Sequence, residues 1–223
     1  MALVKGNVTN TVSSGTSISF SHTQNSGSNR LLFAAIYYYN AETLSNVQYN
    51  GVSMTLIATY EYAADSCKVG LFKLSSPSVG ANTFSATLSI GQSWVATVFS
   101  LTGCSGVGNF ASNGLANTPN SQTLTVSANS FIYCGGTSRY TFDSTAAISI
   151  DGNTTGEASC DAKGQSYLSL VRGELQATAL GAGSITCIVD TIANSFVASN
   201  HRVEFLEAGG GGPPAARRRI IIT

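Results

Sequence analysis

The stretch Arg30-Leu-Leu-Phe-Ala-Ala-Ile-Tyr-Tyr-Tyr39 is apolar on both faces that a β-strand would give it. Successive side chains of a strand point to opposite sides. One side would carry Leu31, Phe33, Ala35, Tyr37 and Tyr39, and the other Leu32, Ala34, Ile36 and Tyr38. A strand of an antiparallel sandwich usually keeps one face toward water. The stretch therefore predicts either a central strand that the chain itself covers on both sides, or an interface with another subunit at Tyr37, Tyr38 and Tyr39.

Period-two alternation of apolar and polar residues continues on both sides of this stretch, and no segment shows a helical stripe. The clearest turn is Asn50-Gly51, a pair typical of a two-residue hairpin in which both residues have positive φ. Many short strands in one chain predict an all-β protein, an antiparallel two-sheet β-sandwich of jelly-roll-like type over residues 1–208. The strands are expected at 3–12, 16–23, 30–39, 45–50, 52–60, 67–74, 83–89, 93–102, 122–127, 130–136, 145–150, 166–172, 183–189 and 194–206.

Two stretches interrupt the alternation and are expected to be irregular. Residues 104–120 read as a long loop, and residues 137–165 as a polar region that holds one short strand. Loops on a rigid scaffold are where binding residues usually lie.

The composition excludes several classes of partner. The 223 residues carry 11 basic and 11 acidic side chains, so no net charge attracts nucleic acid or an anionic membrane. No apolar run reaches the length of about 18 residues that a membrane span needs. The first residues, Met1-Ala-Leu-Val-Lys-Gly, lack the pattern of a secretory signal, so we expect a chain made and kept in soluble form.

The last residues, 209–223, differ in composition from the body. Four glycines and two prolines form a tether that leads to Arg217, Arg218 and Arg219 and then to Ile220, Ile221 and Ile222. The isoleucines are expected to add as a strand to the sheet edge of a neighbouring subunit, while the arginines pair with its acidic or polar rim. The alternative is a disordered tail.

Candidate catalytic and metal-binding residues are few. His22 and His201 are the two histidines, and each is expected to be a polar residue at a strand end. Asp143, Asp151, Glu157 and Asp161 are expected to be solvated turn residues, with a weak Ca²⁺ site as the alternative. Trp94 is expected in the core. No catalytic residue, cofactor site or metal site is therefore predicted.

Five cysteines, an odd number, are spread over apolar segments. Buried free thiols are expected rather than disulfides. These residues are Cys67, Cys104, Cys134, Cys160 and Cys187.

Several segments resemble, in the same order, a β-sandwich module of tailed-phage virion proteins that also occurs in some bacterial surface proteins. The resemblance covers about residues 7–208 and lies in turns and core strands. The segments are Gly15-Thr-Ser-Ile-Ser-Phe-Ser-His22, Gly27-Ser-Asn-Arg-Leu-Leu32, Tyr49-Asn-Gly-Val-Ser-Met-Thr-Leu56, Val69-Gly-Leu-Phe-Lys-Leu74 and Val95-Ala-Thr-Val-Phe-Ser-Leu-Thr-Gly103. The later Ser121-Gln-Thr-Leu-Thr-Val126 and the closing strand from Ser195 to Ala208 keep the same order.

This resemblance implies a structural protein of the virion that is made in the host cytoplasm. A capsid decoration or cement protein is expected, which stabilises the particle by contacts with the major capsid protein or other virion proteins. Such a protein is expected to be a homo-oligomer, with a trimer favoured by the three-fold positions of capsid lattices. The alternative is a tail-fibre or spike component whose loops at 104–120 and 137–165 bind host surface glycans. An enzyme that acts on polysaccharide is the least favoured interpretation.

Overall fold

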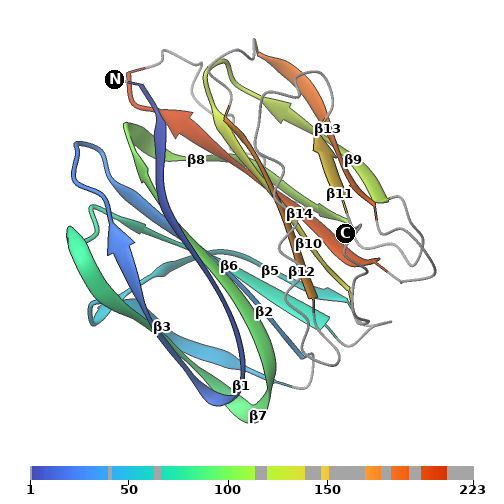
Figure 1. The fold of residues 1–223 in the computed structure, drawn as a ribbon. Coiled ribbons are helices and arrows are strands. Elements are labelled where there is room, and N and C mark those ends of the chain that lie inside the picture. Colours follow the sequence, from blue (N-terminus) through green and yellow to red (C-terminus); the bar gives the residue numbers. More distant parts are fainter. Residues whose placement is uncertain are drawn as a thin grey trace, which may run out of the picture.

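A computed structural model describes residues 2–39, 42–62, 67–113, 120–138, 147–150, 169–176, 182–190 and 197–209. Every regular element in these segments is a β-strand, and all the strand pairs are antiparallel (Figure 1). The all-β antiparallel class predicted from the alternation is confirmed. None of the described residues form a helix long and apolar enough to cross a membrane.

Sheet A is built from the N-terminal half of the chain. Six of its seven strands follow the order β4-β3-β7-β2-β6-β5, and the seventh, β1, pairs with β7. These strands are β1 (Val4–Gln24), β2 (Leu31–Tyr39), β3 (Leu44–Tyr49), β4 (Val52–Ser53), β5 (Thr55–Tyr62), β6 (Cys67–Ser75) and β7 (Gly80–Thr102).

The two longest strands, β1 and β7, bend together and fold sheet A over on itself (Figure 1). Their pairing shifts register between Gly15 and Ser17, where Gly15 has a φ of 118°. A Cβ on Gly91 would lie 3.6 Å from the Cα of Gly15, so two glycines meet at the bend. Glycine and an irregular register allow a sharp bend without loss of pairing on either side. We expected separate strands on each side of this point; the bend joins them instead.

The folded-over sheet is nearly closed, like a barrel, because the two ends of β1 approach each other. The Asn7 side chain donates to the Thr23 carbonyl at 3.0 Å, and the Asn7 backbone N–H donates to Asn25 Oδ1 at 2.8 Å. Core residues fill the space inside. They are Ile18, Leu32, Ala34, Ile36, Tyr38, Val47, Tyr49, Met54, Phe72, Phe84, Ala86, Leu88, Trp94, Ala96 and Val98.

Strand β2 lies at the centre of this arrangement, between β6 and β7. Its residues Leu32, Ala34, Ile36 and Tyr38 belong to the core inside sheet A. A second core outside the sheet contains Leu31, Phe33, Ala35 and Tyr37. Leu31 to Tyr37 are at most 2% exposed. The chain therefore covers both faces of the strand by itself, which is one of the two alternatives that the sequence left open.

Sheet B closes the second core from the other side. Its order is β12-β10-β14-β8, from β8 (Cys104–Asn113), β10 (Phe131–Ser138), β12 (Ser169–Gln176) and β14 (Val197–Glu207). Phe33 and Phe99 of sheet A pack against Tyr133 and Phe205 of sheet B with ring centroids 4.9–5.7 Å apart. Aromatic pairs at such distances are favourable beyond the area that they bury.

A third layer, sheet C, lies on the far side of sheet B (Figure 1). Its order is β11-β13-β9, from β9 (Asn120–Val126), β11 (Ala147–Ile150) and β13 (Gly183–Asp190). Sheets B and C also contain buried residues that belong to neither of the two larger cores. They are Leu124 and Val126 on β9, Ile132 and Cys134 on β10, and Ile185 and Cys187 on β13.

The Asn50-Gly51 hairpin is confirmed, because Tyr49 pairs with Val52 and the two turn residues have φ values of 51° and 73°. The expectation of a loop over 104–120 is wrong for its first part. Residues 104–113 form β8, which pairs with β14 although its sequence does not alternate. The described part of 137–165 contains the end of β10 and all of β11.

Replacing Phe33 with Ala is expected to lower the free energy of unfolding by about 3–5 kcal/mol, because a fully buried ring between three others leaves a cavity. Urea unfolding followed by tryptophan fluorescence measures the change. Leu56→Ala is the control, since Leu56 is 51% exposed and its loss is expected to cost less than about 1 kcal/mol. Equal effects of the two substitutions would contradict the packing of sheet A on sheet B.

Candidate functional site

His201 lies within β14, not at a strand end as the sequence suggested, and it is fully buried. Ser112 Oγ and His201 Nδ1 are 2.7 Å apart, and the Tyr60 ring stacks on the imidazole at 5.3 Å. Burial lowers the pKa of His201 to about 3, and Arg202 acts in the same direction. The imidazole is therefore neutral at physiological pH and joins the two sheets through its contacts with β5 and β8.

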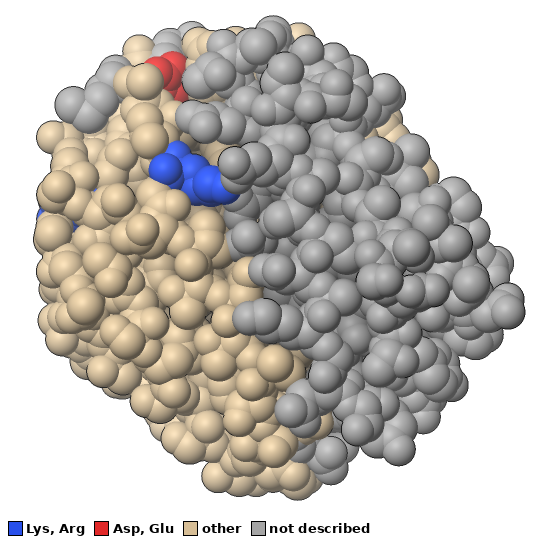
Figure 2. Space-filling model, in the orientation of Figure 1, with Lys and Arg blue, Asp and Glu red and all other residues tan. Residues whose placement is uncertain are grey.

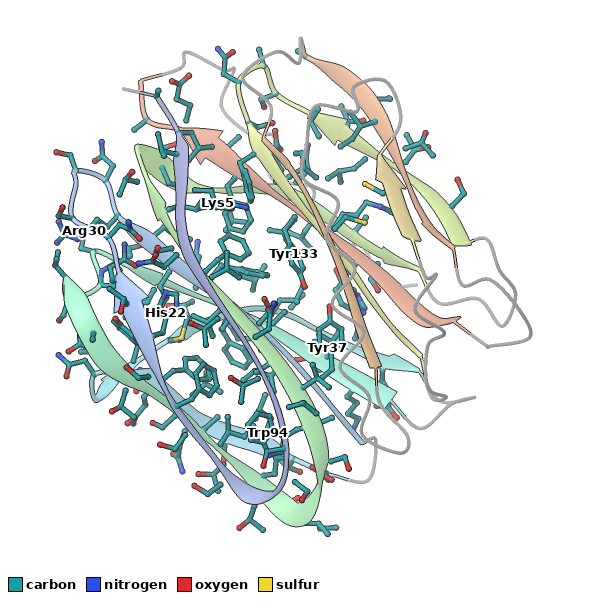
Figure 3. The ribbon with its side chains drawn as sticks, viewed as in Figure 1. Lys5, His22, Arg30, Tyr37, Trp94 and Tyr133 are labelled. Atoms are coloured by element: carbon teal, nitrogen blue, oxygen red, sulfur yellow. The ribbon has the colours of Figure 1, made fainter. Side chains whose placement is uncertain are left out.

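Two tyrosines continue this polar group into the core between sheets A and B. Tyr37 Oη and Tyr133 Oη are 3.2 Å apart, and both side chains are fully buried (Figure 3). A Cβ on Gly135 would lie 2.4 Å from the Tyr133 hydroxyl, so the glycine makes room for the pair. A buried hydroxyl without a partner costs about 1–3 kcal/mol, so the mutual bond satisfies both groups.

His22 is near the end of β1, as expected, but it faces the interior of sheet A and is 1% exposed. Its Nδ1 lies 2.9 Å from Thr9 Oγ1, and its ring meets the edge of Tyr49. Burial lowers its pKa to about 4. His22 therefore supports the closure of sheet A as a neutral side chain.

Glu42 is a buried carboxyl without a hydrogen-bond partner among the described residues. It is 2% exposed, and neither of its carboxylate oxygens has a hydrogen-bond partner there. Burial raises its pKa to about 7. Trp94, 2% exposed, likewise has an indole N–H without a partner in the described chain.

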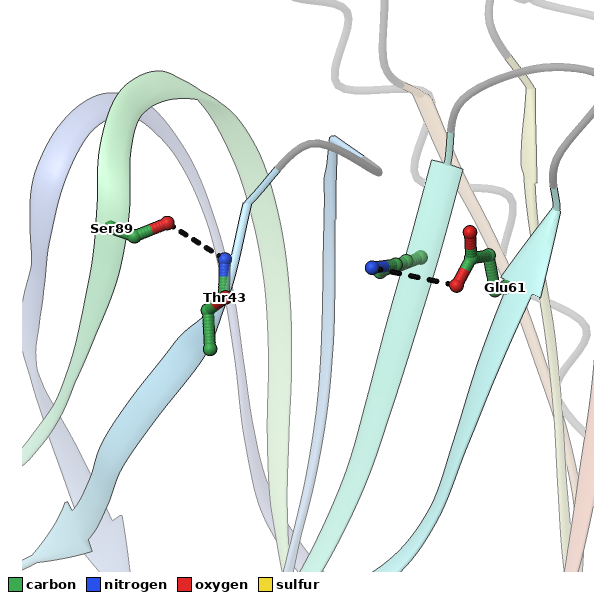
Figure 4. A network of polar contacts seen from close by, with 4 residues as sticks. Thr43, Glu61 and Ser89 are labelled. Atoms are coloured by element: carbon green, nitrogen blue, oxygen red, sulfur yellow. Dashed lines mark hydrogen bonds and ion pairs between the residues drawn. The ribbon is translucent and has the colours of Figure 1, made fainter.

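Two polar contacts are made by Thr43, which follows Glu42 in the chain, and by Glu61 of β5 (Figure 4). The Thr43 N–H donates to Ser89 Oγ at 2.8 Å, and Lys68 Nζ lies 3.4 Å from Glu61 Oε2. Besides burial, the nearby Glu42 and Glu61 raise the pKa of Tyr38. With a pKa of about 7, Glu42 can hold or release a proton near neutral pH.

On the far face of sheet B, Glu204 connects three segments. Its carboxylate accepts hydrogen bonds from the Asn109 and Ser127 backbone N–H groups, at 2.9 and 2.5 Å. Glu204 is 1% exposed, and a carboxylate with charge-assisted bonds of this kind is strongly held. Its role is to tie β8 and the β9–β10 connection to β14.

The outer surface of the folded-over part of sheet A is covered by hydroxyl groups. Along β1 the inward Ile18, Phe20 and His22 alternate with outward serine and threonine. The pattern continues across the neighbouring strands, where Ser17 is opposite Thr87, Ser19 opposite Ser85, and Ser21 opposite Thr83. We call the following residues the hydroxyl face: Ser17, Ser19, Ser21, Thr23, Ser45, Thr83, Ser85 and Thr87.

All of these residues are exposed except Ser85, which is half-buried. The segments that build the face, 16–24, 44–49 and 80–90, contain no Asp, Glu, Lys or Arg. Each hydroxyl can both donate and accept a hydrogen bond. A regular, uncharged array of this kind can contact an extended protein surface without the cost of desolvating charges.

Sequence reasoning missed this face, although its signal was present. The run Ser17-Ile-Ser-Phe-Ser predicts a strand, and its serines mark one face of that strand. The second run, Asn82-Thr-Phe-Ser-Ala-Thr-Leu-Ser89, has the same alternation. The sequence alone does not show that these two runs pair with each other in register. That pairing follows from the neighbouring positions of β1 and β7 in the sheet.

The residues that the sequence proposed for an interface are not brought together on the described surface. Tyr37 is 0% and Tyr38 4% exposed, so they have almost no surface to offer a partner. The side chain of Tyr39 and the residues Arg217 to Ile222 lie outside the described parts, as do Asp143, Asp151, Glu157 and Asp161. Trp94 is in the core, as predicted.

Among the described residues, no cluster of three or more His, Cys, Asp or Glu could hold a metal ion. Comparisons of the chain with protein-family models, with curated proteins and with solved structures gave no match.

Replacing Glu42 with Gln is expected to stabilise the protein above pH 7 and not at pH 4. Between about pH 4.5 and 7 the unfolded chain has lost the Glu42 proton while the folded chain keeps it, so wild-type stability falls as the pH rises. Glutamine has no proton to lose, so the stability of the variant does not fall in this way. Measured by urea unfolding, the free energy of unfolding of the variant relative to wild type should rise by on the order of 2 kcal/mol from pH 4 to pH 8.

The control is Glu61→Gln, because the Glu61 side chain is 52% exposed and its ion pair is worth less than about 1 kcal/mol. If the advantage of the Glu42 variant does not change with pH, the carboxyl is not protonated in the folded state.

Proposed function

We propose that this chain is a structural protein of a tailed-phage virion, most specifically a capsid decoration or cement protein. It acts in the particle after synthesis in the host cytoplasm, and it binds the major capsid protein or neighbouring virion proteins as a homo-oligomer, with a trimer favoured. We also place its all-β body among jelly-roll-like sandwiches, a finer assignment that rests on the resemblance of its turns and core strands to the virion module.

The hydroxyl face is the observation that carries this proposal. A cement protein must bury a large area against its neighbours, and interface cores are depleted of charged residues because burying a charge is costly. Serine and threonine side chains are short, so fixing them costs little conformational entropy compared with lysine or glutamate. The uncharged array on β1, β3 and β7 meets both requirements.

The rest of the described surface agrees with a protein that packs against others. Few charged atoms are visible on the described face in Figure 2. In segments 2–39, 42–62 and 67–113, charged side chains that reach the surface are limited to Lys5, Arg30, Glu61, Lys68 and Lys73. Large apolar side chains are exposed by 45–51%: Val4, Val52, Leu56, Val79, Ile90 and Phe110.

The C-terminal residues 209–223 add a second contact in this proposal. Their sequence joins a flexible tether to three arginines and three isoleucines, and residues 114–208 of a neighbouring copy carry more acidic than basic side chains. Strand addition at an open sheet edge would satisfy the backbone groups of the isoleucines. The glycan-binding alternative gains no such support, because residues 104–113 form a strand rather than a loop.

The proposal predicts that particles of the phage that encodes this chain contain it in hundreds of copies. Quantitative mass spectrometry of purified particles measures the copy number against the major capsid protein. A few copies per particle would instead indicate a tail component, and absence from particles would contradict the virion assignment.

The variant Ser19→Glu tests the hydroxyl face in the same assay. Ser19 is exposed and lies opposite Ser85, so the stability of the isolated protein should change little, while retention on particles should fall at least tenfold because a charge would be buried. Ser184→Glu, at an exposed position of β13 in sheet C, is the matched control and should be retained like wild type. Equal retention of both variants would exclude the hydroxyl face as the contact.

A further inference from the structure

Cys134 and Cys187 face each other between sheets B and C. On β10, Phe131 and Tyr133 point into the core shared with sheet A, so the alternate residues Ile132 and Cys134 point to sheet C. Cys187 lies on β13 of sheet C, and both cysteines are 0% exposed. Their thiols are hydrogen-bonded to each other.

Arg202 completes the group. It is paired with Cys134 across β10 and β14, and its guanidinium contacts both sulfur atoms. The hydrogen bond from Cys134 lowers the pKa of the Cys187 thiol, and Arg202 acts in the same direction against the effect of burial. The same hydrogen bond, with burial, raises the pKa of Cys134. Cys187 therefore gives up its proton more readily than Cys134 does.

We propose that Cys134 and Cys187 are a redox-responsive pair that closes to a disulfide between sheets B and C when the protein meets a small disulfide oxidant. Both are free thiols in the structure, so the structure represents the reduced state. This inference rests on the two cysteines and Arg202 alone and does not depend on the proposed function.

The reaction balances as a thiol–disulfide exchange. The Cys187 thiolate attacks one sulfur of the oxidant and releases the other half as a thiolate, which leaves a mixed disulfide on Cys187. Cys134 then attacks Cys187 Sγ and releases the second half. The two cysteine protons pass to the two released thiolates, so two protein thiols are oxidised and one small disulfide is reduced.

Access requires a local opening, because neither sulfur is exposed. Sheet C, which the described residues show as a layer of three short strands, can open on its own more readily than the large sheets. An S–S bond of about 2.0 Å is shorter than any hydrogen bond between thiols, so closure also draws β10 and β13 together. The disulfide would close a loop of chain from 134 to 187 and so restrict the unfolded state.

The test uses the full chain, purified with reductant and then exposed to oxidised glutathione. Thiols counted in denaturant should fall from five to three, and the intact mass should fall by two hydrogen atoms. Peptide mapping should find the bond between Cys134 and Cys187. The melting temperature should rise by roughly 5–10 °C and return after reduction.

Two variants sharpen the result. Cys104→Ala removes another buried thiol and should still lose two thiols on oxidation, whereas Cys187→Ala should form no internal disulfide. The mapping of the wild-type chain decides the question even if Cys187→Ala folds poorly. Retention of all five thiols, a bond between another pair, or a stable glutathione adduct on Cys187 would overturn the proposal.

Discussion

The burial of β2 on both faces is the constraint on which the rest of the structure depends. A strand whose two faces are both apolar must have a layer of protein on each side. The chain supplies the first layer by folding sheet A over at Gly15 and Gly91, and the second by placing sheet B against Leu31, Phe33, Ala35 and Tyr37. The long bent strands and the layered order of the sheets follow from this requirement.

Several polar side chains that are buried in the protein have hydrogen-bond partners. Tyr37 and Tyr133 satisfy one another, His201 is bonded to Ser112, and Glu204 holds two backbone N–H groups. Glu42 and the Trp94 indole N–H have no hydrogen-bond partner in the described chain, and for Glu42 burial without a partner raises the pKa of the carboxyl. The arrangement leaves the outer surface of segments 16–24, 44–49 and 80–90 with hydroxyl groups instead of charges.

Much of the fold could be predicted from the sequence, because strand alternation is a local property. In the sequence Trp94, Ala96 and Val98 alternate with Val95 and Phe99, and these two sets lie on opposite faces of β7; Asn50-Gly51 correctly placed a hairpin. Residues 104–113 were missed because the edge strand β8 has no regular alternation. The bend of β1 could not be predicted, since Ser14-Gly15 is equally typical of a turn between two strands.

The candidate surface and the buried groups depend on pairing between distant segments. The strand topology brings Ser19 to Ser85 and Cys134 to Cys187. A local sequence pattern does not indicate which strands are neighbours in a sheet. For the same reason Tyr37 and Tyr38 could be assigned to an interface from the sequence, although the chain itself buries them.

Amide hydrogen exchange, read residue by residue, tests the central position of β2 most directly. If β2 is covered on both faces and paired on both edges, the amides of Leu32 to Ile36 should be among the slowest and should exchange only with global unfolding. Amides of the edge strands β4 and β5 should exchange earlier by local opening. Exchange of the β2 amides before those of β5 would contradict the account.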